Sequence, residues 1–251
     1  GIDVTLQATG PELTADLAAK IEFLAEEIRM ALSRFTGRYR DIPLGLNAPT
    51  KVAVAGARIV IDPTNLRVGA GRVALRGTLD PVASDLQTEI AGLPLALIDT
   101  FAPGTGLEGT LQAKVRATGA MASPRLEVSY GATGVRVRRP DAALIPTLSL
   151  QGTGSLIGQQ ATLDARVTAG GSTNLTVKSS AALPRGAAPV DARIALGGSI
   201  DIAPFAPLLG NDIRNITGRL RPNLTVSISG TQITGSGAID FEGGALALPE
   251  A

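Results

Sequence analysis

Apolar and polar residues alternate along most of the chain. Residues 161–168 read Ala-Thr-Leu-Asp-Ala-Arg-Val-Thr, with every apolar side chain at an odd position. Similar alternation marks five further segments: 2–9, 72–79, 111–118, 190–196 and 219–228. A period of two is typical of a β-strand with one apolar face. Extended along the chain, the pattern predicts about 18 strands.

Glycines separate the alternating segments, for example Gly56, Gly170 and Gly230. Glycine accepts positive φ and suits tight turns between antiparallel strands, so we expect successive strands to pair antiparallel. At ~4.8 Å per strand, such a sheet would span roughly 80–90 Å. Open twisted sheets rarely exceed ~10 strands without curling. The chain is therefore predicted to be all-β, with a long antiparallel sheet that curls into a trough, closes into a barrel or folds over as a sandwich.

Two segments break the alternation and predict two short helical elements. They are Leu93–Pro103 and Ile200–Gly210, and both contain Phe-Ala-Pro. Each is followed by an alternating strand, which indicates a loose repeat of about 104–109 residues. We therefore expect three segments of one continuous sheet: 1–92, a first repeat unit at 93–199, and the start of a second at 200–251.

Residues 13–35 fit two structures. Leu13, Leu17 and Ile21 lie at helical spacing, and Leu24, Ile28 and Leu32 continue the series. A strand interpretation also exists, with Ile21 and Phe23 in one strand and Ile28, Met30 and Leu32 in the next. Periodicity alone leaves both open.

Composition excludes several chemistries. The chain has no His and no Cys, so a Ser-His-Asp triad, a Cys-His pair and zinc sites built from these residues are impossible. The net charge of +1 gives no electrostatic reason to expect nucleic acid. No apolar run approaches the ~18–20 residues of a membrane helix, and no secretory signal opens the chain. Because the chain begins and ends within the alternating pattern, we expect it to be a piece of a longer protein.

Candidate catalytic and binding motifs are weak. Residues 104–109 spell G-x-G-x-x-G, but they precede an expected strand, whereas a nucleotide-binding loop precedes a helix. Residues 136–140 form the densest basic cluster, which suits either anionic headgroups or the solvated face of a strand. Carboxylates are scattered and aromatic residues make up only 3%, which disfavours glycosidase chemistry. We expect no enzyme activity, no cofactor and no metal.

The apolar faces are the remaining candidate site. They either pack as a dry core between two sheets or line an open groove. They consist of small aliphatic residues, whereas a closed core usually relies on large aromatics. We expect acyl chains to lie against these residues: Val73, Leu75, Leu111, Val115, Leu163, Val167, Leu175, Val177, Ile194, Leu196, Leu224, Val226 and Ile228.

Several phrases resemble the TamB family of AsmA-like translocation and assembly modules. Residues 107–116 (Leu-Glu-Gly-Thr-Leu-Gln-Ala-Lys-Val-Arg) and 118–127 (Thr-Gly-Ala-Met-Ala-Ser-Pro-Arg-Leu-Glu) are similar to its recurring "G-T-L … S-G-T-L-A-A-P-R-L" phrase. Residues 91–99 (Ala-Gly-Leu-Pro-Leu-Ala-Leu-Ile-Asp) look like another family element. Further similar phrases lie at 42–44, 47–50, 71–77, 219–223 and 243–249.

The resemblance implies a function outside catalysis. TamB-type proteins are periplasmic, anchored in the inner membrane by a segment absent here, and built on a curled sheet called a β-taco, an open β-solenoid trough. The family is implicated in phospholipid transport toward the outer membrane and in outer-membrane protein assembly with a BamA-like barrel. The resemblance also favours strands for residues 19–35. The alternative expectation is a structural or adhesive β-solenoid, such as a passenger domain, without lipid transport.

Overall fold

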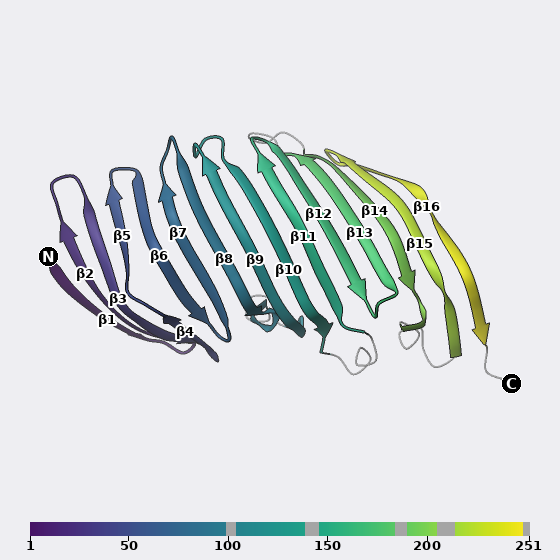
Figure 1. The fold of residues 1–251 in the computed structure, drawn as a ribbon, viewed down its shortest axis with the longest axis horizontal. Coiled ribbons are helices and arrows are strands. Elements are labelled where there is room, and N and C mark those ends of the chain that lie inside the picture. Colours follow the sequence, from purple (N-terminus) through teal and green to yellow (C-terminus); the bar gives the residue numbers. More distant parts are fainter. Residues whose placement is uncertain (99–103, 139–145, 184–189, 205–213, 248–251) are drawn as a thin grey trace. The chain divides into compact units, whose positions relative to one another are not determined.

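In the computed structural model the chain is an all-β protein, described for residues 1–98, 104–138, 146–183, 190–204 and 214–247. Within these ranges sixteen strands form one sheet, and one 3₁₀ element, η1 (Leu95–Leu97), follows the eighth strand (Figure 1). The strands are β1 (Ile2–Thr9), β2 (Leu13–Phe23), β3 (Ile28–Tyr39), β4 (Ile42–Leu46), β5 (Thr50–Ala55), β6 (Arg58–Val68), β7 (Gly71–Leu79), β8 (Ser84–Pro94), β9 (Leu107–Gly119), β10 (Arg125–Val137), β11 (Leu148–Ile157), β12 (Gln160–Ala169), β13 (Thr173–Ala182), β14 (Asp191–Asp201), β15 (Arg214–Ser229) and β16 (Gln232–Ala247).

The predicted antiparallel sheet is confirmed. Neighbouring strands follow chain order, and every pairing described from β1 to β8 and from β11 to β16 is antiparallel. The prediction of about 18 strands was slightly high, because several strands are long: β15 and β16 have 16 residues each.

One position in the sheet is shared by two short strands. The long β3 pairs with β5 through residues 28–32 and with β4 through residues 36–39. Both short strands pair on their other side with β6. The interruption falls at residues 47–49, where Pro49 offers no backbone N–H to a ladder.

Residues 13–23 and 28–35 lie in strands, as the resemblance implied for 19–35, and residues 24–27 form the turn between them. β2 and β3 pair antiparallel, with Ile21 opposite Met30 and Phe23 opposite Ile28. The helical pattern was misleading because a spacing of four is also a multiple of two. Leu13, Leu17 and Ile21 therefore share one face of a strand as readily as one side of a helix.

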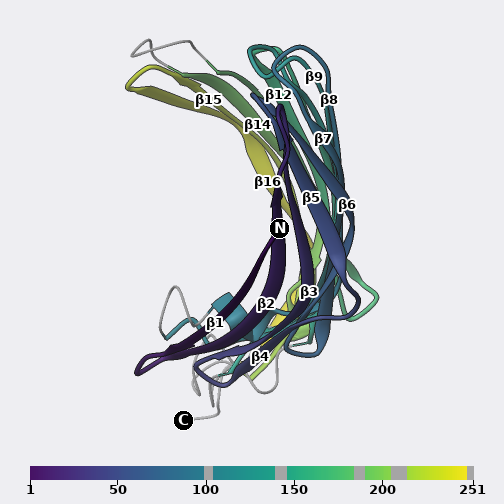
Figure 2. The same ribbon diagram turned by 90° about the vertical axis from the view of Figure 1, so that its left-hand side faces the viewer.

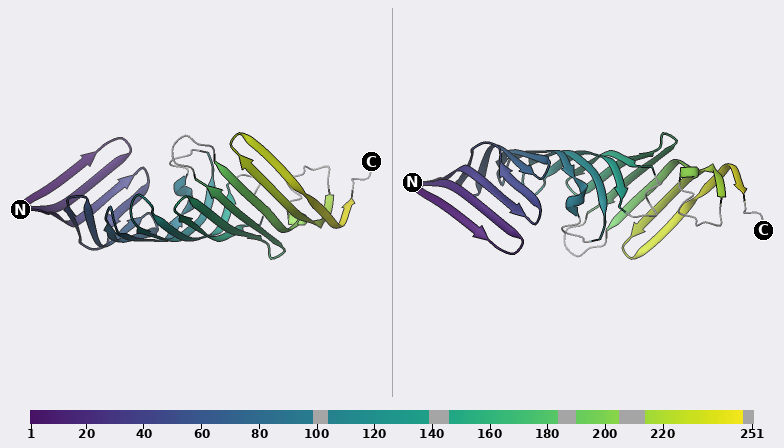
Figure 3. Two further views of the ribbon diagram at one scale, coloured as in Figure 1. Left: turned by 90° about the horizontal axis from the view of Figure 1, so that it is seen from above. Right: turned by 90° about the horizontal axis from the view of Figure 1, so that it is seen from below.

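The chain divides into two compact units. Unit 1 comprises residues 1–97 and 111–128, and unit 2 comprises residues 98–110 and 129–251. Within each unit the strands bow along their length, and consecutive strands run side by side (Figures 2 and 3). The division at 92/93 and 199/200 remains a prediction.

About half of the two predicted helical elements lies outside the described residues. Of the first, Leu93 and Pro94 end β8 and Leu95–Leu97 form η1, while 99–103 are not described. Of the second, Ile200 and Asp201 end β14 and 205–210 are not described. No helix among the described ranges is long and apolar enough to cross a membrane.

Candidate functional site

Strand register in unit 2 gathers the predicted groove residues on one face. Residues directly opposite each other in an antiparallel pair project to the same side. Ala165 lies opposite Val177, and Val177 lies opposite Leu196. Leu196 in turn faces Leu224, which faces Gly237. One apolar row therefore crosses β12 to β16.

Parallel rows extend this surface on both sides. Nine predicted residues belong to it: Leu163, Val167, Leu175, Val177, Ile194, Leu196, Leu224, Val226 and Ile228. Residues that the prediction did not include complete it, among them Leu150, Ile233, Ile239 and Phe241. We call this surface, formed by alternate residues of β11 to β16, the apolar face of unit 2. Its six strands span about 24 Å at the usual strand spacing.

Polar side chains on this face are bonded to the backbone. The Ser179 hydroxyl donates to the carbonyl oxygen of Leu163 at 3.3 Å. The Thr173 hydroxyl oxygen accepts a hydrogen bond from the backbone N–H of Asp201 at 3.1 Å. Since both hydroxyls are engaged, neither breaks the apolar character of the face.

Nothing among the described residues covers the apolar face of unit 2. Ile233 is 72% exposed, Phe241 54% and Leu163 43%, and all three belong to it. In the described part of the chain only Ala19, Leu95, Ala132 and Ala169 are buried hydrophobic residues, and no large side chain falls below 2% exposure. A dry core would bury these aliphatic groups almost completely, so the described residues contain no second layer against this face.

Tyr130 shapes one hollow in this surface. Its ring lies over Gly152, where an added Cβ would meet the Tyr130 hydroxyl oxygen at 2.6 Å. The hydroxyl donates to the backbone carbonyl oxygen of Asp164 at 3.3 Å. Burial and the nearby Asp164 carboxylate raise the pKa of Tyr130. A hollow of about 480 Å³ lies beside the ring, lined in part by Ala165 and Val177.

Unit 1 repeats the arrangement with its own strands. Val73 lies opposite Leu66 and Ile90, and Leu75 lies opposite Thr64 and Thr88. Rows of this kind reach β1, where Ile2 is 56% exposed and lies opposite Ile21. We call this surface the apolar face of unit 1.

The remaining two predicted residues belong to β9. Arg116 pairs with Asp85 at 3.0 Å, and Lys114 pairs with Glu89 at 3.8 Å, so these cations lie on the polar side of β8. Leu111 and Val115 alternate with those cations and therefore project to the apolar side.

A buried threonine pair interrupts the apolar face of unit 1. Thr50 and Thr64 are nearly inaccessible, and their hydroxyl oxygens are 2.6 Å apart. The Thr64 hydroxyl donates to the carbonyl oxygen of Asp62 at 2.9 Å, and the Thr50 hydroxyl oxygen lies 3.4 Å from the same atom, where the β6–β7 register shifts. The pair therefore satisfies a carbonyl group that the shift removes from the ladder.

In the described part of the basic cluster at 136–140, both arginines are already paired with a carboxylate. Arg136 bonds one oxygen of Glu108, and Arg138 bonds the other at 2.6 Å. The Arg136 guanidinium, followed by that of Arg138, holds the pKa of Glu108 below its usual value. The cluster acts as an ion pair between β9 and β10.

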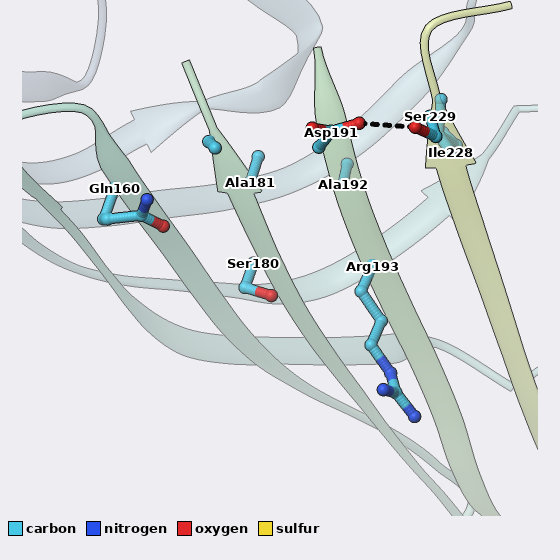
Figure 4. A pocket seen from close by; sticks show the side chains of 9 residues that line it. Gln160, Ser180, Ala181, Asp191, Ala192, Arg193, Ile228 and Ser229 are labelled. Carbon is cyan, nitrogen blue, oxygen red and sulfur yellow. Dashed lines mark hydrogen bonds between the residues drawn. The ribbon is translucent and has the colours of Figure 1, made fainter. Parts of the chain in front are cut away.

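A second hollow of unit 2 contains mixed groups. It measures about 360 Å³ and is lined by residues near the ends of β12 to β15 (Figure 4). The Ser229 hydroxyl donates to the Asp191 carboxylate at 2.7 Å, while Arg193 extends along β14. No two carboxylates converge among its lining residues, so the hollow offers no acid–base pair.

The glycine motif at 104–109 does not form a nucleotide-binding loop in the structure. Gly104, Gly106 and Gly109 have positive φ, and β9 begins at Leu107, so the loop leads into a strand. No group of three or more metal-binding side chains gathers within the described ranges. Comparisons with protein-family models, with curated proteins and with solved structures found no match to this chain.

Proposed function

We propose that the two apolar faces bind the acyl chains of phospholipids and that the protein is part of a periplasmic lipid conduit between the inner and outer membranes. The observation that carries this proposal is the uncovered apolar face of unit 2, which crosses six strands without an unsatisfied polar side chain. Aliphatic side chains without a fixed polar partner bind fatty tails without selecting among them. Headgroups would remain in water beside the sheet.

The energy of such binding is adequate. Burial of a methylene contributes ~0.8 kcal/mol, so a chain of about 15 methylenes gains on the order of 10 kcal/mol when fully covered. One face of a sheet covers only part of each chain, and association has an entropic cost. The net affinity is therefore moderate and reversible, as a carrier requires.

A charge introduced on the apolar face tests the proposal. Leu163→Arg places a guanidinium among aliphatic groups, and its high exposure lets the fold accept the change. Thr162→Arg is the matched control, because Thr162 lies on the polar face opposite Ser155 and Ser180. Val226→Arg and Thr225→Arg form a second pair, since Thr225 lies opposite Ala195 and Ser236.

The readouts are binding of a fluorescent fatty acid and transfer of labelled phospholipid between vesicles. We expect the apolar-face variants to lose both by at least about ten-fold, because a charge is poorly solvated by fatty tails. The controls should keep both, and circular dichroism should report unchanged strand content in all four. Equal activity of Leu163→Arg and Thr162→Arg would overturn the proposal and favour a structural or adhesive role.

A further inference from the structure

Charged residues that lie directly opposite each other on neighbouring strands carry opposite charges, with one exception. In the registers from β1 to β8 and from β11 to β16, opposite charges meet at six positions: Asp3–Lys20, Glu22–Arg29, Asp164–Lys178, Asp201–Arg219, Arg219–Glu242 and Arg221–Asp240. In the same registers Arg67 of β6 lies directly opposite Arg72 of β7. Like charges in this position destabilise a sheet, so this pair stands apart from the rest.

Neither arginine has a carboxylate partner among the described residues. Arg67 and Arg72 are flanked across the sheet by Gly45 and Ala91, which carry no polar side chain. The nearest acidic position along β8, Glu89, lies opposite Ala74 and pairs with Lys114. The two guanidinium groups are thus left without a counter-ion by their immediate neighbours.

The orientation of the Arg67 side chain agrees with repulsion between the two arginines. Its Nη2 atom lies 3.5 Å from the point where a Cβ on Gly45 would stand. The side chain therefore leans toward β4, away from Arg72 on the β7 side. Gly45 provides room that a larger residue would occupy.

We propose that Arg67 and Arg72 together bind a phosphate oxyanion. Guanidinium groups present planar pairs of N–H donors that match phosphate oxygens. If Arg67 turned from Gly45 back toward β7, the two groups on opposed strands would bracket one anion, which would remove the repulsion between them. The pair lies on the polar side of the sheet, opposite Leu66 and Val73, so this site is separate from the proposed acyl surface.

Titration of inorganic phosphate into the intact chain at constant ionic strength tests the site. We expect phosphate to bind and to raise the melting temperature above that in chloride. Arg67→Gln and Arg72→Gln should each weaken phosphate binding at least about ten-fold, since each removes charge-assisted hydrogen bonds. Arg34→Gln is the control, because Arg34 already pairs with Asp16 at 2.9 Å. An equal loss in all three variants, or no preference for phosphate over chloride, would overturn the proposal.

Arg72→Glu provides a second test, in which the expected result is a gain of thermal stability instead of a loss of phosphate binding. It replaces the like-charge pair by an opposite-charge pair, so we expect a higher melting temperature in phosphate-free buffer and no response to phosphate. A variant less stable than the original chain in phosphate-free buffer would contradict the assigned repulsion.

Vesicle flotation separates the two sources of the anion. Vesicles of phosphatidylcholine with phosphatidic acid present a lipid phosphate, and pure phosphatidylcholine is the reference. Recruitment that Arg67→Gln abolishes and Arg34→Gln keeps identifies a lipid headgroup, whereas phosphate binding without recruitment identifies a free phosphate. If the chain binds neither inorganic phosphate nor vesicles with phosphatidic acid, the proposed phosphate site is overturned. The proposal of acyl-chain binding is unaffected by that result, because Leu163→Arg tests it separately.

Discussion

The two units have similar apolar faces and different polar faces. In unit 1 seven ion pairs lie among the described residues, including Arg34–Asp16 and Arg116–Asp85. In unit 2 the polar face consists largely of hydroxyl and amide groups, such as Thr153, Thr176 and Asn223. Three ion pairs lie among its described residues, and their carboxylates are those of Glu108 and Glu242.

The difference shows which side of the sheet is constrained. A polar face only has to be hydrated, and charged or hydroxyl side chains satisfy that requirement equally well. Both units nevertheless keep uncovered aliphatic residues on the other face, such as Met30 in unit 1 and Ile194 in unit 2. Since exposed apolar surface is unfavourable in water, its presence in both units supports a ligand-binding role for this face.

The largest expected effect concerns one glycine in each unit. Gly77 has φ 134°, and a Cβ added there would lie 2.0 Å from the carbonyl oxygen of Asp85. Gly198 has φ 124°, and a Cβ added there would lie 2.2 Å from the carbonyl oxygen of Asn174. We expect Gly77→Ala and Gly198→Ala to destabilise their own unit by roughly 3 kcal/mol. Hydrogen exchange should accelerate in β7 and β8 for the first and in β13 and β14 for the second.

Gly56→Ala is the control for this pair. Gly56 also has positive φ, at 57°, but no atom lies within 4 Å of its added Cβ. Its cost should stay near the ~1–2 kcal/mol of a left-handed residue. If all three variants were equally stable, close strand contact would not be the reason for glycine at positions 77 and 198.

Alternation predicts which residues share a face along a regular stretch of a strand, but it reveals neither irregularities within a strand nor long-range pairing. Leu32 and Phe35 lie three apart, so a period of two assigns them to opposite faces. Leu32 lies opposite Ala19 and Phe35 opposite Leu17, because a register shift at Ala18/Ala19 changes the parity between them. The placement of Tyr130 over Gly152 was equally hidden, because it depends on how two separate strands meet. Whether an apolar face is covered depends on other elements, which its own sequence does not describe.

A second prediction asks whether the apolar face of unit 1 binds acyl chains as we propose for unit 2. Val73→Arg should lower binding of a fluorescent fatty acid about ten-fold if both faces are used, because it introduces a charge beside Leu66 and Ile90. Ala74→Arg is the control, since Ala74 lies opposite Asn65 and Glu89 on the polar side. Unchanged binding in Val73→Arg, together with a loss in Leu163→Arg, would restrict the proposed function to unit 2.

A smaller effect is expected for the two tyrosines, one in each unit. Tyr130→Phe removes a hydrogen bond to a backbone carbonyl and should cost about 0.5–1 kcal/mol. Tyr39→Phe should cost less, because the Tyr39 ring lies under Arg40, with 5.7 Å from the guanidinium carbon to the ring centroid, and phenylalanine keeps that contact. Chemical denaturation followed by circular dichroism measures both; a greater loss in Tyr39→Phe would contradict the role given to the Tyr130 hydroxyl.

The pKa of Tyr130 adds a pH dependence to this comparison. Because burial raises its pKa above the ordinary value, the unfolded chain loses the phenolic proton first as pH rises. The stability that Tyr130 contributes is thus complete below about pH 10 and is lost as pH rises through the folded pKa. Absorbance titration of Tyr39→Phe, which leaves Tyr130 as the single tyrosine, should show a midpoint above that of free tyrosine.

The smallest expected effect is the response of the two polar faces to acid. A hydrogen bond from Arg116 is the main cause that lowers the pKa of Asp85, and a hydrogen bond from Arg29 does the same for Glu27. Groups with a lowered folded pKa contribute stability above their unfolded pKa, near 4, and lose it as pH falls through the folded value. Unit 1 should therefore lose protection from hydrogen exchange below about pH 4 more than unit 2, after correction for intrinsic exchange rates.

The variant Asp85→Asn should narrow that difference in protection between the units. Added salt at neutral pH should also narrow it, because exposed ion pairs are screened. A unit 2 that is more acid-sensitive than unit 1 would show that the ion pairs of the first polar face contribute nothing measurable, which would leave hydration as the only requirement on that side of the sheet.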